Sequence, residues 1–291
     1  MKQKTIQELL EFGILNIDKP QNPTSFDISD FVRRRMNEAG IKVRKTSHFG
    51  TLDPKVTGVL PIALNRACKL TGFFLGEDKE YVGIMRVHGE IEMKEIQQSI
   101  NKKFLGKILQ TPPVKSRVKR QERERDIKKF ELLEQDGKDI LFHTTVEGGT
   151  YIRKLIDDLG KEMGIGAHML ELRRIKAGIF SENDNEFVNL YDFEKALDEF
   201  EKGDGKSLRK ILIPGEIISR LHYSIQVKEE SIEKLLTGKP VLKKDLNEKS
   251  NAKKDKIVSG FCGERFIGMY KVLNEQEVFA KPKFVLQPMK N

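Results

Sequence analysis

The strongest constraint on this chain is the run SHFGTLDPKVTGVLP, which holds a single carboxylate in a fixed bend. Asp53 precedes Pro54, and a residue before proline is pushed out of the helical region toward extended geometry. Gly50 and Gly58 flank the pair and allow backbone turns that a side chain would block. An isolated Asp-Pro pair is more often a simple turn-former. The longer pattern predicts that Asp53 lies at the corner of a loop, before a buried strand VTGVLPIAL.

Composition restricts the class of protein and its partners. The 291 residues are enough for one large domain or for a large and a small one. The chain is 38% hydrophobic and 33% charged with a formal net charge of +9, which favours a nucleic acid over a membrane as partner. Cys68 and Cys262 are far apart, so neither a disulfide framework nor a metal site is expected. Charges interrupt the first 20 residues, so we expect no signal peptide or membrane span and a cytoplasmic location.

The pattern of apolar residues predicts an alternation of strands and helices. A helix capped by Thr24 or Ser25 should end at Gly40, and an apolar stripe predicts another helix from Ile152 to Gly164. The other expected elements are a strand in GILNIDKP, a strand over 59–64, a helix over 65–74, a strand over 79–87, a helix over 93–104, strands over 130–133 and 140–146 joined at Asp136 and Gly137, and a strand over 171–180 with Arg173 and Arg174 at its start. Beyond residue 220, short strands predict a small β-rich domain.

Two sets of basic residues are candidates for function. Six follow Pro112 and Pro113 within eleven positions: Lys115, Arg117, Lys119, Arg120, Arg123 and Arg125. Such a run is often only a solvated face, but it is the best candidate for contact with phosphates. Arg153 lies in the first turn of a predicted helix, where the helix dipole disfavours a cation. We therefore expect Arg153 to pair with a specific carboxylate.

Several motifs together resemble the TruB family of pseudouridine synthases. NIDKP, GTLDPKVTG, KEYV, QTPPVKSRVKR, GGTYIR and GAHMLELRR occur in the order of that family. The resemblance implies that Asp53 is the essential catalytic residue and that Arg153 pairs with it. It also implies that Tyr81 stacks on the target base, that Leu172 lines the uracil pocket, and that His48 fills the space of the flipped base. The simpler alternatives are a half-buried strand tyrosine, a core leucine and a loop histidine bonded to backbone.

The resemblance also implies a fold and a setting. Lys19 and Pro20 of NIDKP would support the active-site loop from beneath. The fold would be α+β, with a mixed, largely antiparallel sheet flanked by helices in a catalytic domain over 13–218. An arm over 1–12 would precede it, and a PUA-like RNA-binding domain would follow over 219–291. The segments GAHMLELRRIKAGIF and PPVKSRVKRQERER are similar in sequence to the dyskerin-like catalytic subunits of H/ACA guide-RNA particles.

The implied reaction needs no cofactor and no metal. Converting uridine to pseudouridine breaks the bond from C1′ to N1, rotates the base and joins C1′ to C5, without redox change or group transfer. The sequence has no GxxxxGK[ST], GxGxxG or HExxH motif. The substrate would be the uridine of the TΨC arm of tRNA, or a ribosomal RNA site chosen by an H/ACA guide RNA with small accessory proteins. The rival hypothesis is a non-catalytic RNA-binding scaffold.

Overall fold

The protein is described by a computed structural model that covers residues 4–112 and 121–288, and it divides into two compact units. One unit comprises residues 14–213, and the other comprises residues 1–13 and 214–291. The N-terminal segment that we expected as an arm forms helix α1 (Ile6–Glu11). Thr5 caps this helix, and Leu9 and Leu10 are buried. By its contacts, α1 belongs to the same unit as the C-terminal residues.

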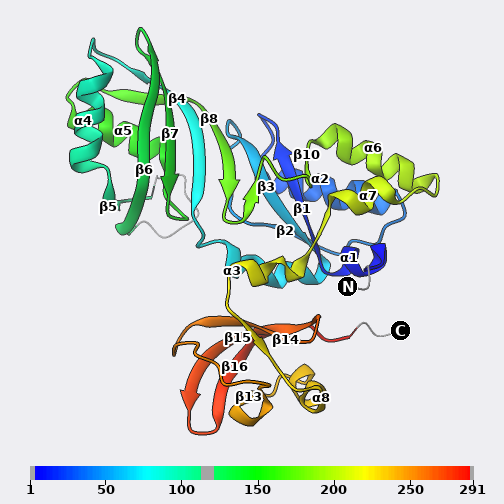
Figure 1. Cartoon of the computed structure of the whole chain (residues 1–291). Coiled ribbons are helices and arrows are strands. Elements are labelled where there is room, and N and C mark those ends of the chain that lie inside the picture. Colours follow the sequence, from blue (N-terminus) through cyan, green and yellow to red (C-terminus); the bar gives the residue numbers. More distant parts are fainter. Residues whose placement is uncertain (1–3, 113–120, 289–291) are drawn as a thin grey trace. The chain divides into compact units, whose positions relative to one another are not determined.

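The larger unit is built on a mixed sheet. Within the described residues this sheet has 11 strands, with a central path β10-β1-β3-β8-β4-β7-β6-β5 (Figure 1). The strands are β1 (Gly13–Lys19), β2 (Thr46–His48), β3 (Thr57–Leu64), β4 (Lys79–Val87), β5 (Gly106–Gln110), β6 (Arg123–Asp136), β7 (Asp139–Val146), β8 (Ala167–Ala177), β9 (Phe180–Ser181), β10 (Phe187–Val188) and β11 (Leu212–Pro214). Strand β1 pairs in parallel with β10, and β3 with β8, whereas the neighbours along the rest of the path are antiparallel. The expected mixed, largely antiparallel sheet is confirmed.

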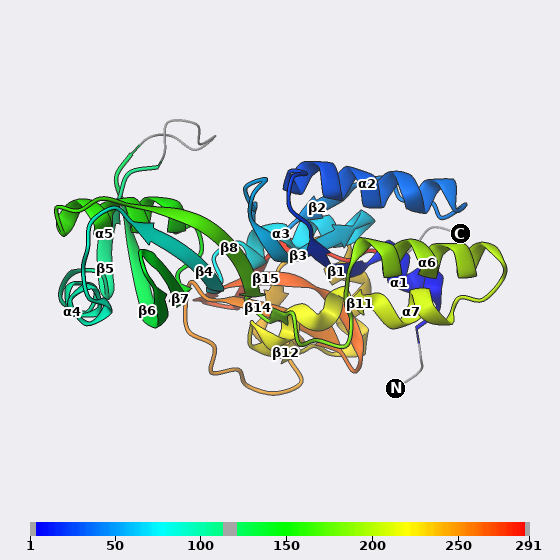
Figure 2. The ribbon, with the colours of Figure 1, turned by 90° about the horizontal axis from the view of Figure 1, so that it is seen from above.

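Helices flank this sheet in two groups. They are α2 (Ser25–Glu38), the 3-10 helix η1 (Asn65–Leu70), α3 (Thr71–Phe74), α4 (Met93–Lys103), α5 (Ile152–Glu162), α6 (Leu190–Glu201) and α7 (Lys206–Ile211). Helices α2, α6 and α7 lie beside the β1 and β10 end of the sheet, and α4 and α5 lie beside the β5, β6 and β7 end (Figures 1 and 2). The predicted stripe of α5 is buried, and each such aliphatic side chain contributes about 2 kcal/mol to folding.

The largest differences from the expected elements concern two strands and one helix. The strand predicted over 171–180 begins at Ala167, so Arg173 and Arg174 lie in its interior, and Arg174 is only 1% exposed. The strand predicted over 130–133 begins at Arg123, and the helix predicted over 65–74 is a 3-10 helix followed by one α-helical turn. The missed start of β6, RERDIKK, is mostly charged, which hides the alternation of apolar and polar side chains. The missed start of β8, AHML, is not charged, but its short apolar run has no alternation that marks a strand.

The second unit contains a five-stranded sheet in the order β12-β14-β15-β16-β13. Its elements are η2 (Gly215–Arg220), β12 (Ser224–Gln226), η3 (Glu229–Ser231), α8 (Ile232–Leu236), β13 (Val241–Leu242), η4 (Lys243–Asp245), β14 (Ile257–Cys262), β15 (Arg265–Glu275) and β16 (Val278–Val285). Apolar side chains of the sheet and of α8 form one core, which includes Leu235, Val258 and Tyr270. The expected small β-rich C-terminal domain is confirmed.

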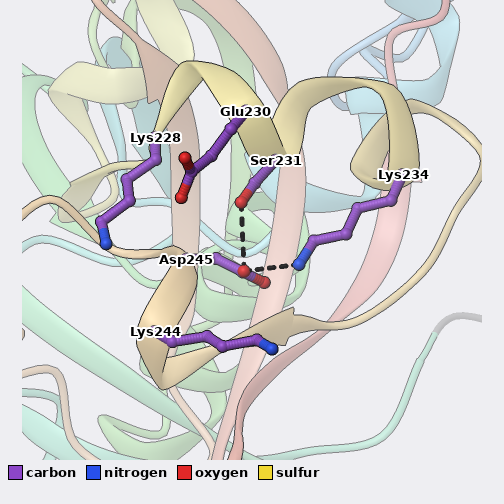
Figure 3. A pocket seen from close by; sticks show the side chains of 6 residues that line it. All are labelled: Lys228, Glu230, Ser231, Lys234, Lys244 and Asp245. Carbon is purple, nitrogen blue, oxygen red and sulfur yellow. Dashed lines mark hydrogen bonds and ion pairs between the residues drawn. The ribbon is translucent and has the colours of Figure 1, made fainter.

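A buried carboxylate joins the short helical segments of this unit. Asp245 accepts hydrogen bonds from Ser231 Oγ at 3.0 Å and Lys234 Nζ at 2.5 Å (Figure 3). It also accepts one from the Leu242 amide at 2.8 Å. Burial raises the pKa of Asp245, but hydrogen bonds from Lys234, Leu242 and Ser231 outweigh it, so the pKa lies below its ordinary value. The charged carboxylate therefore holds η3, α8 and β13 together.

Gly58, at the start of β3, allows the closest backbone approach in the sheet next to the Asp53 loop. Its φ is +98°, and a Cβ there would lie 2.2 Å from the Arg174 carbonyl oxygen. We predict that Gly58→Ala lowers the free energy of unfolding by about 3 kcal/mol, because strands β3 and β8 must separate. Gly40→Ala is the control: φ is +76° but no atom lies within 4 Å of the added Cβ. Gly40→Ala should lower the free energy of unfolding by only about 1 kcal/mol. If urea unfolding gives equal losses of this free energy in the two variants, the prediction is contradicted.

Candidate active site

Asp53 lies on the exposed loop between β2 and β3, and backbone hydrogen bonds fix this loop. The Val56 amide donates to the Asp53 carbonyl at 3.0 Å, which closes a turn around Pro54. Ser25, at the start of α2, accepts from the Leu52 amide at 2.7 Å and donates to the Leu52 carbonyl at 3.0 Å. The residue before Asp53 is therefore held on both sides by one hydroxyl. The expected corner position of Asp53 agrees with this geometry.

Lys19 lies beneath the loop and binds its backbone. The residue is 0% exposed, and its ammonium donates to the carbonyls of Pro20 at 2.8 Å, Pro54 at 3.2 Å and Val56 at 2.8 Å. Burial, with a smaller contribution from Arg174, lowers the pKa of Lys19. The three carbonyl oxygens stabilise the charge that burial disfavours. The Lys19 ammonium thus binds only backbone carbonyls, two of them in the Asp53 loop and one at Pro20.

Arg153 reaches Asp53 from the first turn of α5, 100 residues further along the chain. Arg153 Nη2 donates to Asp53 Oδ2. The side chains of Asp53 and Arg153 are 50% and 63% exposed, so both are open to solvent. An exposed pair of this kind contributes little to stability. The effect of the pair is on orientation, because the guanidinium holds one carboxylate oxygen in place.

The sheet brings Tyr81 and Leu172 to the same face. In the antiparallel register of β4 and β8, Tyr81 is opposite Arg174 and Gly83 is opposite Leu172. Directly opposed residues share a face of the sheet, so Tyr81, Leu172 and Arg174 point the same way. Tyr81 is 8% exposed and Leu172 is 6% exposed. Both side chains are therefore nearly covered.

Arg174 connects this face of the sheet to the Asp53 loop. Its guanidinium donates to the carbonyls of Val59 at 2.8 Å and Gly50 at 3.0 Å, which lie on either side of Asp53 in the chain. Burial lowers the pKa of Arg174, and the neighbouring Tyr81 hydroxyl opposes that shift. Sequence reasoning missed this residue because it placed Arg174 at the solvated start of a strand. The signal was the pair Arg173 and Arg174, which must face opposite sides of a strand.

His48 is held between two hydroxyl groups at the end of β2. Its Nδ1 lies 3.3 Å from Ser29 Oγ, and its Nε2 lies 3.1 Å from Thr51 Oγ1. Burial, with a smaller contribution from Arg174, lowers the pKa of the imidazole. The simpler alternative of a loop histidine bonded to backbone is wrong in detail, since His48 is in a strand and these bonds go to side chains.

The proposed phosphate contacts divide into two groups. Lys115, Arg117, Lys119 and Arg120 lie outside the described residues. Arg123 begins β6 and is partly exposed. Arg125 Nε donates to the Gly149 carbonyl at 3.1 Å, and its Nη1 donates to the Glu124 carbonyl at 3.0 Å. Arg125 therefore supports the bend before α5, a structural contact that the sequence did not indicate.

Other kinds of site are limited by what the described residues contain. Within 4–112 and 121–288, no group of three or more His, Cys, Asp or Glu side chains is arranged to hold a metal ion. Cys68 and Cys262 are free thiols. Among the described helices, none combines the length and the hydropathy that crossing a bilayer requires.

Family models match two consecutive parts of the chain. Residues 37–152 match the TruB family pseudouridylate synthase N-terminal domain, and residues 153–218 match the tRNA pseudouridylate synthase B C-terminal domain. The chain is 39% identical over 264 residues to the probable tRNA pseudouridine synthase B of Archaeoglobus fulgidus, covering 89% of this chain and 78% of the relative. It is 40% identical over 243 residues to that of Methanocaldococcus jannaschii, covering 82% and 69%.

Solved structures agree over nearly the whole chain. The Cbf5 chain of a Cbf5-Nop10-Gar1 complex superposes with a TM-score of 0.90 at 31% identity, covering 99% of this chain and 88% of that one. A chain of an H/ACA ribonucleoprotein bound to a substrate RNA containing 2′-deoxyuridine superposes with a TM-score of 0.87 at 30% identity, covering 99% and 89%. The fold and the site thus define an isomerase of the pseudouridine synthase class. Within that class, the chain belongs to the TruB family.

The lowered pKa of His48 predicts a pH dependence of stability. Because the folded state binds a proton at His48 more weakly than the unfolded chain, the contribution of His48 is complete above the unfolded pKa of about 6.5. It is lost as the pH falls from there through the folded pKa. We predict that His48→Gln makes the free energy of unfolding fall less steeply between about pH 7 and pH 5. Urea unfolding at a series of pH values measures this, and an unchanged slope would refute it.

Proposed function

We propose that Asp53 is the catalytic carboxylate of this pseudouridine synthase and that Arg153 orients it. The observation that carries the proposal is the ion pair between these two residues of distant motifs, formed on an exposed loop where an RNA can approach. A single ionised carboxylate suffices for the reaction, either as a nucleophile on the sugar or base or as a base that removes a sugar proton. During the isomerisation, C5 of uracil loses a proton and N1 gains one, so the overall proton balance is zero.

The neighbouring residues supply what a flipped base needs. Extruding a base costs a few kcal/mol, which stacking and side-chain insertion offset. Tyr81 and Leu172 share the face of the sheet to which Arg174 ties the Asp53 loop. We assign stacking to Tyr81, the uracil pocket to Leu172 and the space left by the base to His48. The basic residues Lys115, Arg117, Lys119, Arg120 and Arg123 would bind RNA phosphates, with Arg125 supporting the bend before α5.

For the substrate, the relatives suggest two modes. The archaeal relatives are named as probable tRNA synthases, which supports the uridine of the TΨC arm of tRNA. The solved Cbf5 complex with Nop10 and Gar1, and the H/ACA particle with a substrate RNA, support guide-directed modification with small accessory proteins. The C-terminal β unit would be a PUA-like RNA-binding domain, and a cytoplasmic location remains a prediction. The scaffold hypothesis is disfavoured because a scaffold needs no orienting arginine on a carboxylate.

One assay distinguishes these modes. The purified chain is incubated with unmodified tRNA alone, and separately with a ribosomal RNA fragment, an H/ACA guide RNA, Nop10 and Gar1, and pseudouridine is mapped in each. We expect product in tRNA without guide and in the fragment only with guide. Product in one reaction alone would restrict the enzyme to that mode. If neither RNA is modified, the chain acts as a scaffold and the proposal fails.

The catalytic assignment predicts a specific loss. Asp53→Asn keeps the size of the side chain but removes its charge, so turnover should fall by at least about 10³-fold. RNA affinity should stay within about threefold, because exposed ion pairs contribute little. The control is Asp157→Asn, which removes another exposed carboxylate paired with a cation, Lys161, on α5. It should keep wild-type turnover. A loss of less than about tenfold in Asp53→Asn would contradict the assignment.

A further inference from the structure

The bend before α5 determines where Arg153 starts. Tyr151 is the N-cap of α5, with extended backbone at φ −96° and ψ 98°, and its side chain makes no capping hydrogen bond. Arg153 follows two residues later in the first helical turn. Residues that hold the Tyr151 backbone therefore set the position from which the guanidinium reaches Asp53.

Gln110 holds that backbone with both ends of its amide. Its Nε2 donates to the Tyr151 carbonyl at 3.3 Å, and its Oε1 accepts from the Tyr151 amide at 3.0 Å. Gln110 is the last residue of β5 and only 2% exposed. The buried Gln110 amide bonds both the N–H and the C=O of Tyr151. These two bonds together fix the position and the rotation of the Tyr151 backbone.

Neighbouring contacts hold the other side of the same bend. Strand β5 pairs with β6 so that Gln110 is opposite Arg123. Two residues along β6, Arg125 donates to the Gly149 carbonyl. The edge of the sheet thus binds the bend at Gly149 and at Tyr151, and only the second contact lies next to the helix that carries Arg153.

We propose that Gln110 is a positioning residue for the reaction, acting through Tyr151 and α5 on Arg153. This inference rests on the proposed function of the Asp53 and Arg153 pair. A displacement of about 1 Å at a reacting group can reduce the rate about 10²-fold, so a contact two residues from Arg153 affects turnover although it touches no substrate. Because binding of RNA does not depend on this contact, the effect falls on kcat rather than on KM.

The chain offers a matched control. Gln97 of α4, which is partly buried, also bonds the backbone with both ends of its amide: its Nε2 donates to the Phe130 carbonyl at 3.0 Å, and its Oε1 accepts from the Leu132 amide at 2.9 Å. Its Nε2 donates in addition to Asn101 Oδ1 at 2.9 Å. Gln110→Met and Gln97→Met each remove two such bonds from an unbranched side chain of similar length. We expect kcat to fall about 30-fold in Gln110→Met, with KM within about twofold, and to stay unchanged in Gln97→Met. Equal kcat values in the two variants would overturn the proposal.

A double-variant experiment tests whether the effect passes through Arg153. Adding Gln110→Met to Arg153→Ala should lower kcat no further, because residues that act through one group are not additive. If kcat of the double variant instead falls by the product of the two single-variant losses, the proposal is overturned.

The variant Gln110→Glu tests the proposal independently of whether Gln110→Met folds. In Gln110→Glu, the new carboxyl group has one donor and one acceptor only when it is protonated, and the protonated form can therefore restore both bonds to Tyr151. The kcat of Gln110→Glu relative to wild type should recover as the pH falls from about 8 to about 5.5. A constant ratio across that range would contradict the positioning role.

Hydrogen exchange separates this inference from the proposed function. Amides of residues 151–155 should exchange about tenfold faster in Gln110→Met and at the wild-type rate in Gln97→Met, whether or not the chain is active. Unchanged exchange refutes the positioning role alone. Full turnover by Asp53→Asn, with faster exchange in Gln110→Met, refutes the catalytic assignment and leaves the structural contact intact.

Discussion

The site depends on the hydrogen bonds that the buried guanidinium of Arg174 donates to backbone carbonyls. Taking such a charge out of water costs several kcal/mol, and its hydrogen bonds to backbone carbonyls offset that cost only if the loop stays in place. The carbonyls belong to Gly50 and Val59, so the charge in the sheet requires the loop conformation that carries Asp53. Lys19 adds a second buried cation on the loop's backbone. Two cations bound to carbonyls hold the Asp53 loop, together with the buried apolar side chains of Phe49, Leu52 and Val56.

The ion pair that we propose as the catalytic pair differs from this buried network in its exposure. Asp53 and Arg153 are largely exposed, and each comes from an element that the rest of the fold holds rigidly. The loop is fixed by Lys19 and Arg174, and the first turn of α5 is fixed by Gln110. Such a division suits an enzyme whose substrate is a folded RNA: the supporting network is formed before binding, and the carboxylate remains accessible to an everted base.

The local sequence predicted the strand over 79–87 with its observed bounds, because every second side chain of this strand lies on a buried face. The start of β8 was wrong because its first residues, AHML, do not alternate between apolar and polar side chains. Roles for Asp53, Tyr81 and Arg153 came from resemblance to the TruB family, and pairing of Arg153 with a carboxylate also followed from its place at a helix N-terminus.

The sequence by itself determined the family through its motifs, and the α+β class followed from that resemblance. Glycine, proline and apolar periodicity act over a few residues, so they predicted the loop that carries Asp53. Only the tertiary structure decided which charges are buried and what they bind. Arg174, Lys19 and Gln110 have polar side chains that predict exposure, and their partners are carbonyl and amide groups of distant segments. Backbone groups are the same at every residue, so no sequence pattern marks them as partners. Their positions follow only from how the strands and helices pack.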